Sequence, residues 1–195
     1  MDFQQVVQKR RMVRAFREEP LAREVVERIL ANGNRAPSAG FTQGYGFLVL
    51  EEAVDRARFW ETVTTADHQP AVEEVAAPLL VIPLACKIAY LDRYAEPDKG
   101  WTDRDEAYWP IPYWYIDTAF AALLMLLTAV DEGLGGLFFG LPPEATPVLR
   151  TVFGVPDDHE PIGVIAIGQP APGGSTGSAW RGRRPLDQVV HRGHW

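Results

Sequence analysis

The chain has 195 residues, of which 47% are hydrophobic and 23% charged, and its formal net charge is −7. This composition is typical of a globular protein and argues against disorder, and the net acidity speaks against nucleic acid as a partner. The single cysteine, Cys86, excludes an internal disulfide framework and a Cys₄ metal site, so a reducing compartment, and hence a cytoplasmic location, is expected. The most apolar stretch, Ala119–Val130, is shorter than the ~20 residues that span a bilayer, so no membrane is expected as a partner.

Segments with helical spacing of apolar residues alternate along the chain with short runs of β-forming residues. This order predicts a mixed α+β sandwich. Pro83 is expected to end the second strand or to lie on a sheet edge, since proline cannot donate a ladder hydrogen bond. Residues 87–112 are polar and aromatic and too long for a structureless connection, so we expect them to be functional or partly helical. Helices are predicted at residues 2–9, 21–33, 53–66, 113–133 and 142–153, and strands at residues 45–50, 78–84, 135–140 and 161–168.

Basic residues gather at the two ends of an otherwise acidic chain. No acid interrupts the group near the N-terminus, and only Asp187 opposes the group near the C-terminus. The two ends can therefore converge on one anion, although two separate, solvated basic surfaces would give the same pattern. Arginine suits such an anion, because its planar fork of donors stays charged and matches phosphate oxygens. The first group comprises Lys9, Arg10, Arg11, Arg14 and Arg17, and the second comprises Arg181, Arg183, Arg184 and Arg192.

Two further segments have the composition of backbone that contacts a ligand. Ala36–Gly40 combines small side chains with the hydroxyl of Ser38, and Gly135–Gly136 can present backbone N–H groups. Familiar catalytic motifs are absent: there is no Walker A sequence, no Rossmann glycine fingerprint, no HExxH and no GxSxG. His191 and His194 form an HxxH pair, but no third ligand can be named, so no metal site is expected.

Taken in order, these segments resemble the nitroreductase family of flavin enzymes. The resemblance rests on RRMVRAF at residues 10–16, on Ala36–Ser38 with Gln43, on Gly133–Gly135 and on RRPL at residues 183–186. Each motif is weak alone, but together they follow the family's order and spacing. They cover the chain from residue 3 to Trp195.

The resemblance implies an α+β fold of the nitroreductase type. It would be an α/β/α sandwich with a central, mostly antiparallel sheet, forming an intertwined homodimer that exchanges C-terminal arms. Residues 1–195 would form one flavin-binding domain, with residues 178–195 as the arm and residues 87–112 as a lid or substrate segment. Two FMN molecules would lie at the dimer interface, with Pro37–Ala39 supplied by the partner subunit. The implied FMN contacts are Arg10, Arg11, Met12, Arg14, Pro37, Ser38, Ala39, Gln43, Gly135, Gly136, Leu137, Arg181 and Arg183.

The activity implied by the resemblance is oxidoreductase chemistry with NAD(P)H as co-substrate. Hydride would pass to flavin N5, and two electrons would then pass to a nitroaromatic or quinone acceptor in a ping-pong cycle that needs no catalytic side chain. The dense aromatic residues of the 87–112 segment suit a small, flat substrate, although they can equally pack the core or a dimer surface. The expected substrate contacts are Phe41, Tyr94, Trp101 and Trp109.

Two positions depart from the family's pattern. Phe41 stands where many members carry an asparagine that bonds the pyrimidine edge of the flavin, and Met12 replaces a commoner serine. These departures leave open a deazaflavin in place of FMN. The alternatives are a non-catalytic flavin or deazaflavin binding protein, a dehalogenase or flavin-degrading relative on the same fold, and an interaction module with two basic surfaces.

Overall fold

The computed structural model describes residues 1–64, 70, 75–173 and 177–195. Within these residues the chain forms a five-stranded sheet whose pairings are all antiparallel. Its strands are β1 (Tyr45–Leu50), β2 (Leu79–Ala85), β3 (Gly135–Phe139), β4 (Glu160–Pro161) and β5 (Val164–Gly168). The strand order is β1-β2-β5-β3. β4 and β5 both pair with the same side of β2: β5 pairs with Leu79–Val81 and β4 pairs with Leu84 and Ala85.

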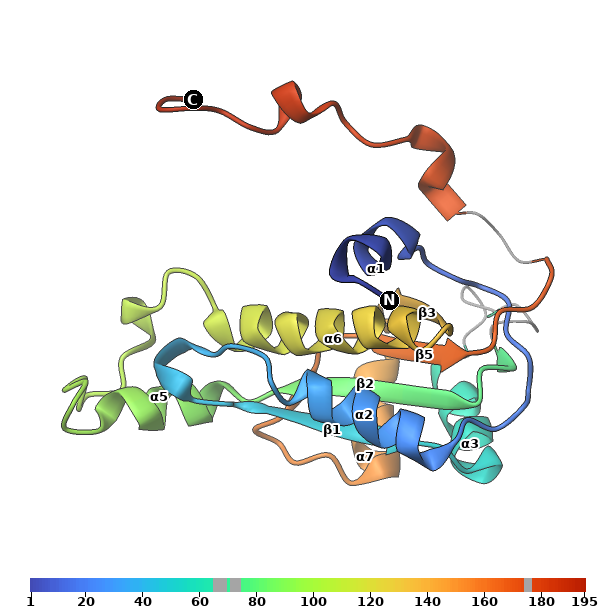
Figure 1. The fold of residues 1–195 in the computed structure, drawn as a ribbon. Coiled ribbons are helices and arrows are strands. Elements are labelled where there is room, and N and C mark those ends of the chain that lie inside the picture. The colour runs from blue at the N-terminus through green and yellow to red at the C-terminus, as the bar shows by residue number, and fades with distance from the viewer. Residues whose placement is uncertain (65–69, 71–74, 174–176) are drawn as a thin grey trace.

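Helices form a layer on each side of this sheet. They are α2 (Arg23–Gly33), α3 (Ala53–Val63), α6 (Tyr113–Asp131) and α7 (Ala145–Phe153). α2 and α6 cover one face, and α3 and α7 cover the other (Figure 1). The predicted α/β/α sandwich with an antiparallel sheet is therefore confirmed.

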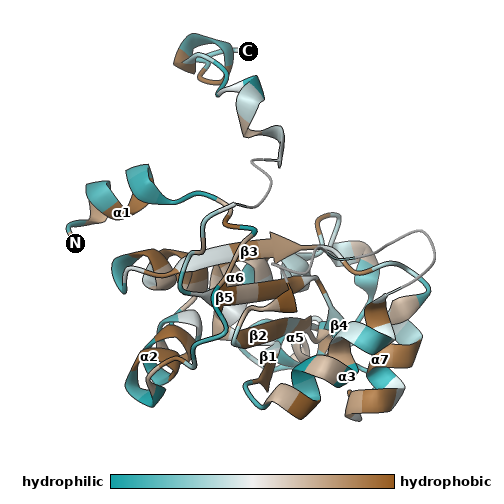
Figure 2. Ribbon diagram, turned by 90° about the vertical axis from the view of Figure 1, so that its right-hand side faces the viewer, coloured by the Kyte–Doolittle hydropathy of each residue, from teal (hydrophilic) through white to brown (hydrophobic). Residues whose placement is uncertain are grey.

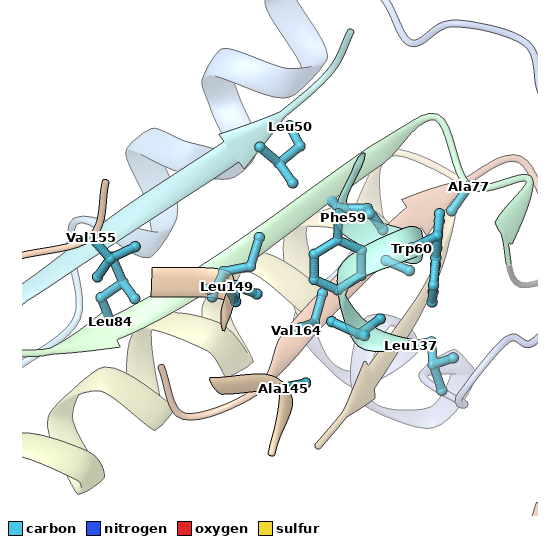
Figure 3. Packing of buried hydrophobic residues seen from close by; sticks show 14 of the residues in the cluster. Leu50, Phe59, Trp60, Ala77, Leu84, Leu137, Ala145, Leu149, Val155 and Val164 are labelled. Carbon is cyan, nitrogen blue, oxygen red and sulfur yellow. The ribbon is translucent and has the colours of Figure 1, made fainter. Parts of the chain in front are cut away.

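The two faces of β2 show how the sequence builds the sandwich. Successive side chains of a strand point to opposite faces. Leu80 and Ile82 accordingly join the cluster with α3 and α7, whereas Leu79 and Val81 join the cluster with α2 and α6. Figure 3 shows the first cluster from close by, with the fully buried Leu149 of α7 among its members. β2 is buried on both faces, which explains its uninterrupted apolar sequence.

α6 is the central helix of the second layer. Among the described residues it is the helix that is long and apolar enough to cross a membrane by length and composition. Here it lies along the sheet (Figure 1), and Ala121, Met125 and Ala129 are fully buried against α2 and the strands. We therefore assign α6 as a core helix. Phe120 and Leu123 on another side of it are 42% and 46% exposed, so α6 also presents an apolar strip to the outside.

The expectation that Pro83 would end its strand or lie on an edge is wrong. β2 is a central strand that runs through Pro83, which pairs with Phe47 of β1 on one side. On the other side Ile162 donates its N–H to the Pro83 carbonyl oxygen at 3.0 Å. The pairing register shifts by one residue between β4 and β5, which places a β-bulge at residues 162–163. The proline is tolerated because the bulge interrupts the ladder that would have used its N–H, and the same bulge divides the predicted strand 161–168.

The remaining predicted elements differ from the structure mainly at their ends. α1 (Phe3–Lys9) begins after Asp2, whose carboxylate accepts the Gln5 N–H as an N-cap. α7 begins three residues later than predicted. The helix predicted at 53–66 ends at Val63, and residues 65 and 66 lie outside the described residues. The 87–112 segment contains α5 (Lys87–Ala95) and a 3₁₀ turn at Glu106–Tyr108, so its expected partial helicity is confirmed.

The C-terminal residues form an arm that belongs to none of the hydrophobic clusters of the described chain. It contains two 3₁₀ turns, at Gly177–Arg181 and Leu186–Gln188, and every residue from 178 to 195 is exposed. Figures 1 and 2 show it leaving the sandwich beyond α1. The arm therefore leaves large apolar side chains uncovered, among them Trp180 and Trp195, which are 80% and 97% exposed.

Candidate functional site

Backbone hydrogen bonds attach the N-terminal basic segment to the sheet. Met12 forms a parallel bridge with Gly136 of β3, and the Val13 N–H donates to the Gly136 carbonyl oxygen at 3.0 Å. On the other side of the segment, residues 15–17 exchange hydrogen bonds of 2.9 Å with residues 169–171, directly after β5. Ala15 and Phe16 are buried at this junction. The arginines that precede them are therefore held along a fixed backbone.

The two glycines at the start of β3 make this attachment possible. A Cβ on Gly135 would lie 2.8 Å from the Cβ of Val13, and a Cβ on Gly136 would lie 2.7 Å from a methyl group of Leu126. The absence of side chains at these two glycines thus lets the basic segment pack closely against β3, where the Gly136 carbonyl oxygen accepts the Val13 N–H. Leu137 is a core residue, 3% exposed. The structure brings none of these three predicted FMN contacts into the pocket described next.

The two basic ends of the chain meet at one pocket of about 640 Å³. Arg10, Arg11, Arg14 and Arg183 line it, together with Met12 and small residues around Pro170 and Ser178, and none of the described residues that line it is acidic. In the described part of the chain none of these four arginines takes part in an ion pair. We call this the arginine pocket. It concentrates uncompensated positive charge where an anion can enter.

Neighbouring residues extend and shape the arginine pocket. A second cavity of about 560 Å³ shares Arg10 and Arg11 with it and adds Lys9. The guanidinium of Arg14 lies against Gly177, where an added Cβ would be 2.8 Å from Nη1. Arg181 is not among the lining residues, and its guanidinium lies 6.0 Å from the ring centre of Trp180. The pocket thus depends on the arm folding back over the N-terminal segment.

The predicted Pro–Ser loop is a separate feature with its own internal bonds. The Ser38 hydroxyl accepts the Gln43 N–H at 2.9 Å, and the Ala39 N–H donates to the Asp117 carboxylate at 2.8 Å. Phe41 and Gln43 both have a positive φ, 55° and 54°, which is unusual for residues with side chains. Phe41 is 75% exposed. The loop is tightly constrained and presents an aromatic ring to the outside.

The aromatic residues predicted as substrate contacts cluster beside this loop. Tyr94 lies 4.8 Å from Trp101 and 4.5 Å from Trp109 between ring centres. A Cβ on Gly40 would lie 2.8 Å from the Tyr94 ring, so the cluster adjoins the loop directly. Trp109 is 9% exposed and packs with other rings, which favours a core role for it. Tyr94 and Trp101 are half-buried and remain accessible at the margin of the cluster.

The N-terminal segment after α1, which carries arginines of the pocket, and the Pro37–Gln43 loop lie at opposite ends of the sheet (Figure 1). Gly136, which Met12 contacts, pairs with Ile167 of β5, and Ile167 pairs with Leu79. The N-terminal basic segment therefore lies at the end of the sheet where β2 begins. The loop ends at Gly44, whose carbonyl oxygen accepts the N–H of Cys86, just past the other end of β2. A strand of this length separates them by about 20 Å. Within one chain, the structure therefore does not bring Pro37–Gln43 together with the arginines.

One group of potential metal ligands occurs among the described residues, and the sequence analysis missed it. One ligand atom from each of Cys86, Asp158 and His159 lies within 4.8 Å of the others, and His191 and His194 are not part of the group. The Cys86 thiol lies 3.8 Å from one carboxylate oxygen of Asp158, and His159 Nδ1 lies 2.8 Å from the other. Burial raises the pKa of the Cys86 thiol, and His159 lowers the pKa of Asp158. The three groups thus satisfy one another, away from the arginine pocket.

Comparison with known proteins agrees with this fold. A model of the nitroreductase family matches residues 7–169. The chain is 28% identical over 189 residues to an NADPH-dependent oxidoreductase from Staphylococcus aureus strain bovine RF122, covering 95% of this chain and 71% of that protein.

Solved structures share the fold at lower sequence identity. A nitroreductase family protein from Clostridium difficile 630 superimposes with a TM-score of 0.73 at 22% identity, covering 100% of both chains. An FMN-dependent nitroreductase from Clostridium difficile R20291 superimposes with a TM-score of 0.72 at 18% identity, covering 97% of this chain and 98% of that one. Because the family model spans most of its length, the chain belongs to the nitroreductase family.

Proposed function

We propose that this protein binds FMN in the arginine pocket and catalyses the two-electron reduction of small nitroaromatic or quinone acceptors at the expense of NAD(P)H. The observation that carries the proposal is the convergence of Arg10, Arg11, Arg14 and Arg183, from both ends of the chain, on one pocket whose described lining residues include no acid. The NADPH dependence of the relative from Staphylococcus aureus and the FMN dependence of the structural relative support the choice of cofactor and donor.

The pocket suits a phosphorylated cofactor in charge and in size. Guanidinium groups form charge-assisted, often bidentate hydrogen bonds with phosphate oxygens. A volume of about 640 Å³ lies within the range of small-molecule sites. The residues present therefore fit FMN. A bound FMN would supply hydride acceptance from NAD(P)H and electron transfer to an acceptor.

The chain's own side chains bind and tune the cofactor. We assign Arg14 and Arg183 to the phosphate, because Arg183 is on the arm and Arg14 lies against the residue where the arm begins. The half-buried Arg10 holds a fixed positive charge in the pocket, which favours a bound group in its more negative, reduced state. No acid or nucleophile from the protein is needed, which accords with the lack of a catalytic motif.

We assign the second half of each site to a second copy of the chain. The Pro37–Gln43 loop and its aromatic cluster lie about 20 Å, the length of β2, away from the arginines of their own chain. Apolar residues are exposed on α1, on α6 and along the arm, among them Phe3, Phe120 and Val189. A homodimer in which these surfaces meet would bury them and bring the loop of one subunit to the pocket of the other. Tyr94, Trp101 and Phe41 would then line the entrance for a flat substrate.

The test starts with the chromophore that copurifies with the full chain. The proposal expects a yellow protein whose released cofactor has the mass of FMN, and whose colour is bleached when NADPH or NADH is added without oxygen. Addition of a quinone or nitroaromatic compound should restore the colour. A chain that stays colourless and fails to bind added FMN contradicts the proposal. A bound flavin that neither nucleotide reduces would make the protein a flavin carrier instead of an enzyme.

A further inference from the structure

A buried carboxylate stands at the base of the Pro–Ser loop. Asp117 of α6 is 2% exposed, and the other buried residues of this helix are apolar side chains and the neutral threonines Thr118 and Thr128. Its Oδ2 accepts the Ala39 N–H and the Tyr90 hydroxyl, both at 2.8 Å. No ion pair of Asp117 occurs among the described residues. Burying a carboxylate that only neutral donors satisfy is costly, whereas an apolar side chain here would pack without that cost.

The loop that Asp117 holds cannot rely on ordinary backbone preferences. Gly40, Phe41 and Gln43 all have a positive φ, and two of these residues carry side chains that disfavour it. Such a conformation persists only where the surroundings impose it. Besides the Asp117 bond, the Arg93 side chain donates to the Gly40 carbonyl oxygen at 3.0 Å. α5 and α6 therefore clamp the loop from outside.

Tyr90 completes this arrangement from α5. Its ring is fully buried, and a Cβ on Gly44 would lie 2.5 Å from it, so the ring abuts the end of the loop. Burial, and the hydrogen bond to Asp117, raise the pKa of Tyr90 far above its usual range, so the hydroxyl stays protonated and donates. Tyr90 thus fixes the orientation of the carboxylate that fixes Ala39.

We propose that Asp117 is a positioning residue for the flavin site: it holds the Pro37–Ala39 loop in the shape that contacts the cofactor, and Tyr90 orients it. Because the Ala39 N–H donates to Asp117, it is not available to a ligand. The loop would therefore contact the cofactor through Pro37, Ser38 and the other atoms of Ala39. This inference rests on the proposed function, because it assigns the loop to the flavin.

The test compares three variants of the full chain. Asp117→Ala should weaken FMN binding at least tenfold and speed hydrogen exchange at the Ala39 amide. Asp117→Asn keeps an oxygen acceptor for that amide and should restore FMN binding to within about threefold of the parent. Thr118→Val is the matched control: Thr118 is the next residue, fully buried, and within the part of the chain that the structure describes its hydroxyl bonds only to the Trp114 carbonyl oxygen of its own helix. It should leave FMN binding and loop exchange unchanged.

The outcomes separate this inference from the proposed function. If the parent binds FMN and Asp117→Ala binds it equally well, or if Thr118→Val loses as much affinity, the positioning role is refuted while the function stands. If the parent itself binds no FMN, the function fails and the inference fails with it. Should Asp117→Ala not fold, Tyr90→Phe takes its place, since it removes one donor to Asp117 and keeps the buried ring. It should weaken FMN binding measurably, and unchanged binding would refute the inference.

Discussion

The sharpest test of the arginine pocket is the unequal cost of removing two of its arginines. A hydrogen bond that involves a charged group contributes about 1.5–3 kcal/mol, and the value falls with exposure because water screens the charge. Arg14 is half-buried against the arm, whereas Arg183 is exposed. Arg14→Ala should therefore cost near the upper figure and Arg183→Ala near the lower one.

At about 1.4 kcal/mol per tenfold change, these costs correspond to roughly a 150-fold and a tenfold weaker Kd for FMN. Titration of the cofactor-free protein with FMN, followed by flavin fluorescence, measures both values. Arg14→Lys should fall between the parent and Arg14→Ala, because lysine keeps the charge and loses the planar fork of donors. Raising the salt concentration should narrow the differences in Kd between the parent and these variants, because salt partly screens the attraction between the arginines and the phosphate.

Arg23→Ala is the matched control. Arg23 lies on α2, outside the pocket, with its guanidinium 3.9 Å from Glu27. Its loss should leave the Kd for FMN unchanged. If Arg14→Ala and Arg183→Ala both bind FMN like the parent, or if Arg183 matters more than Arg14, then the assignment of these side chains to the phosphate is wrong.

Five other variants test the fold and the site. Gly135→Ala should weaken FMN binding, because the added Cβ would displace Val13 and with it the neighbouring arginines of the same segment. Gly140→Ala is its control and should leave FMN binding unchanged, because an added Cβ there meets no described atom. Leu149→Ala should lower the free energy of unfolding by about 2–5 kcal/mol in urea titrations, since Leu149 is fully buried. Arg93 lowers the pKa of Asp98, so this pair stabilises the fold above the unfolded pKa of about 3.9, and the contribution is lost as the pH falls through the lower folded value. Arg93→Gln should therefore lose less stability between neutral and acid pH than the parent does. Deletion of residues 177–195 should leave a folded chain, because the arm belongs to none of the described clusters, but it should bind FMN poorly and elute as a monomer in size-exclusion chromatography.

Local patterns predicted those parts of the fold in which the chain's own periodicity decides the structure. The run Tyr45–Leu50 and the apolar segment before Cys86 form strands because their side chains fit a buried pleated sheet. The signal for α5 was also present: Tyr90, Leu91 and Tyr94 follow helical spacing, and all face the aromatic cluster. It was obscured by the polar residues that cover the other side of this helix.

Features that depend on distant parts of the chain could not be predicted in this way. Pro83 is tolerated in a central strand only because a bulge at residues 162–163 opens the neighbouring ladder. Asp117 bonds to a backbone group 78 residues away, and Cys86 approaches a carboxylate 72 residues away. An acid inside an otherwise apolar helix was a usable signal for Asp117, since a buried carboxylate needs donors from elsewhere. The identity of those donors follows only from the fold.

The candidate site illustrates the same limit at a larger scale. Charge alone suggested that the two ends of the chain meet, as they do at the arginine pocket, whereas the predicted contacts Gly135, Gly136, Leu137 and Arg181 do not line it. Charge and spacing along a sequence carry no information about which end of a sheet a loop occupies, and the separation of the Pro–Ser loop from the arginines was implied only by the family resemblance, which assigns that loop to the partner subunit. In the proposed homodimer, a second copy would supply the half of the site that one chain does not bring to its own arginines. The exposed apolar side chains of α6 and of the arm therefore belong to the same physical argument as the arginines: they are the surface that the proposed second copy would cover.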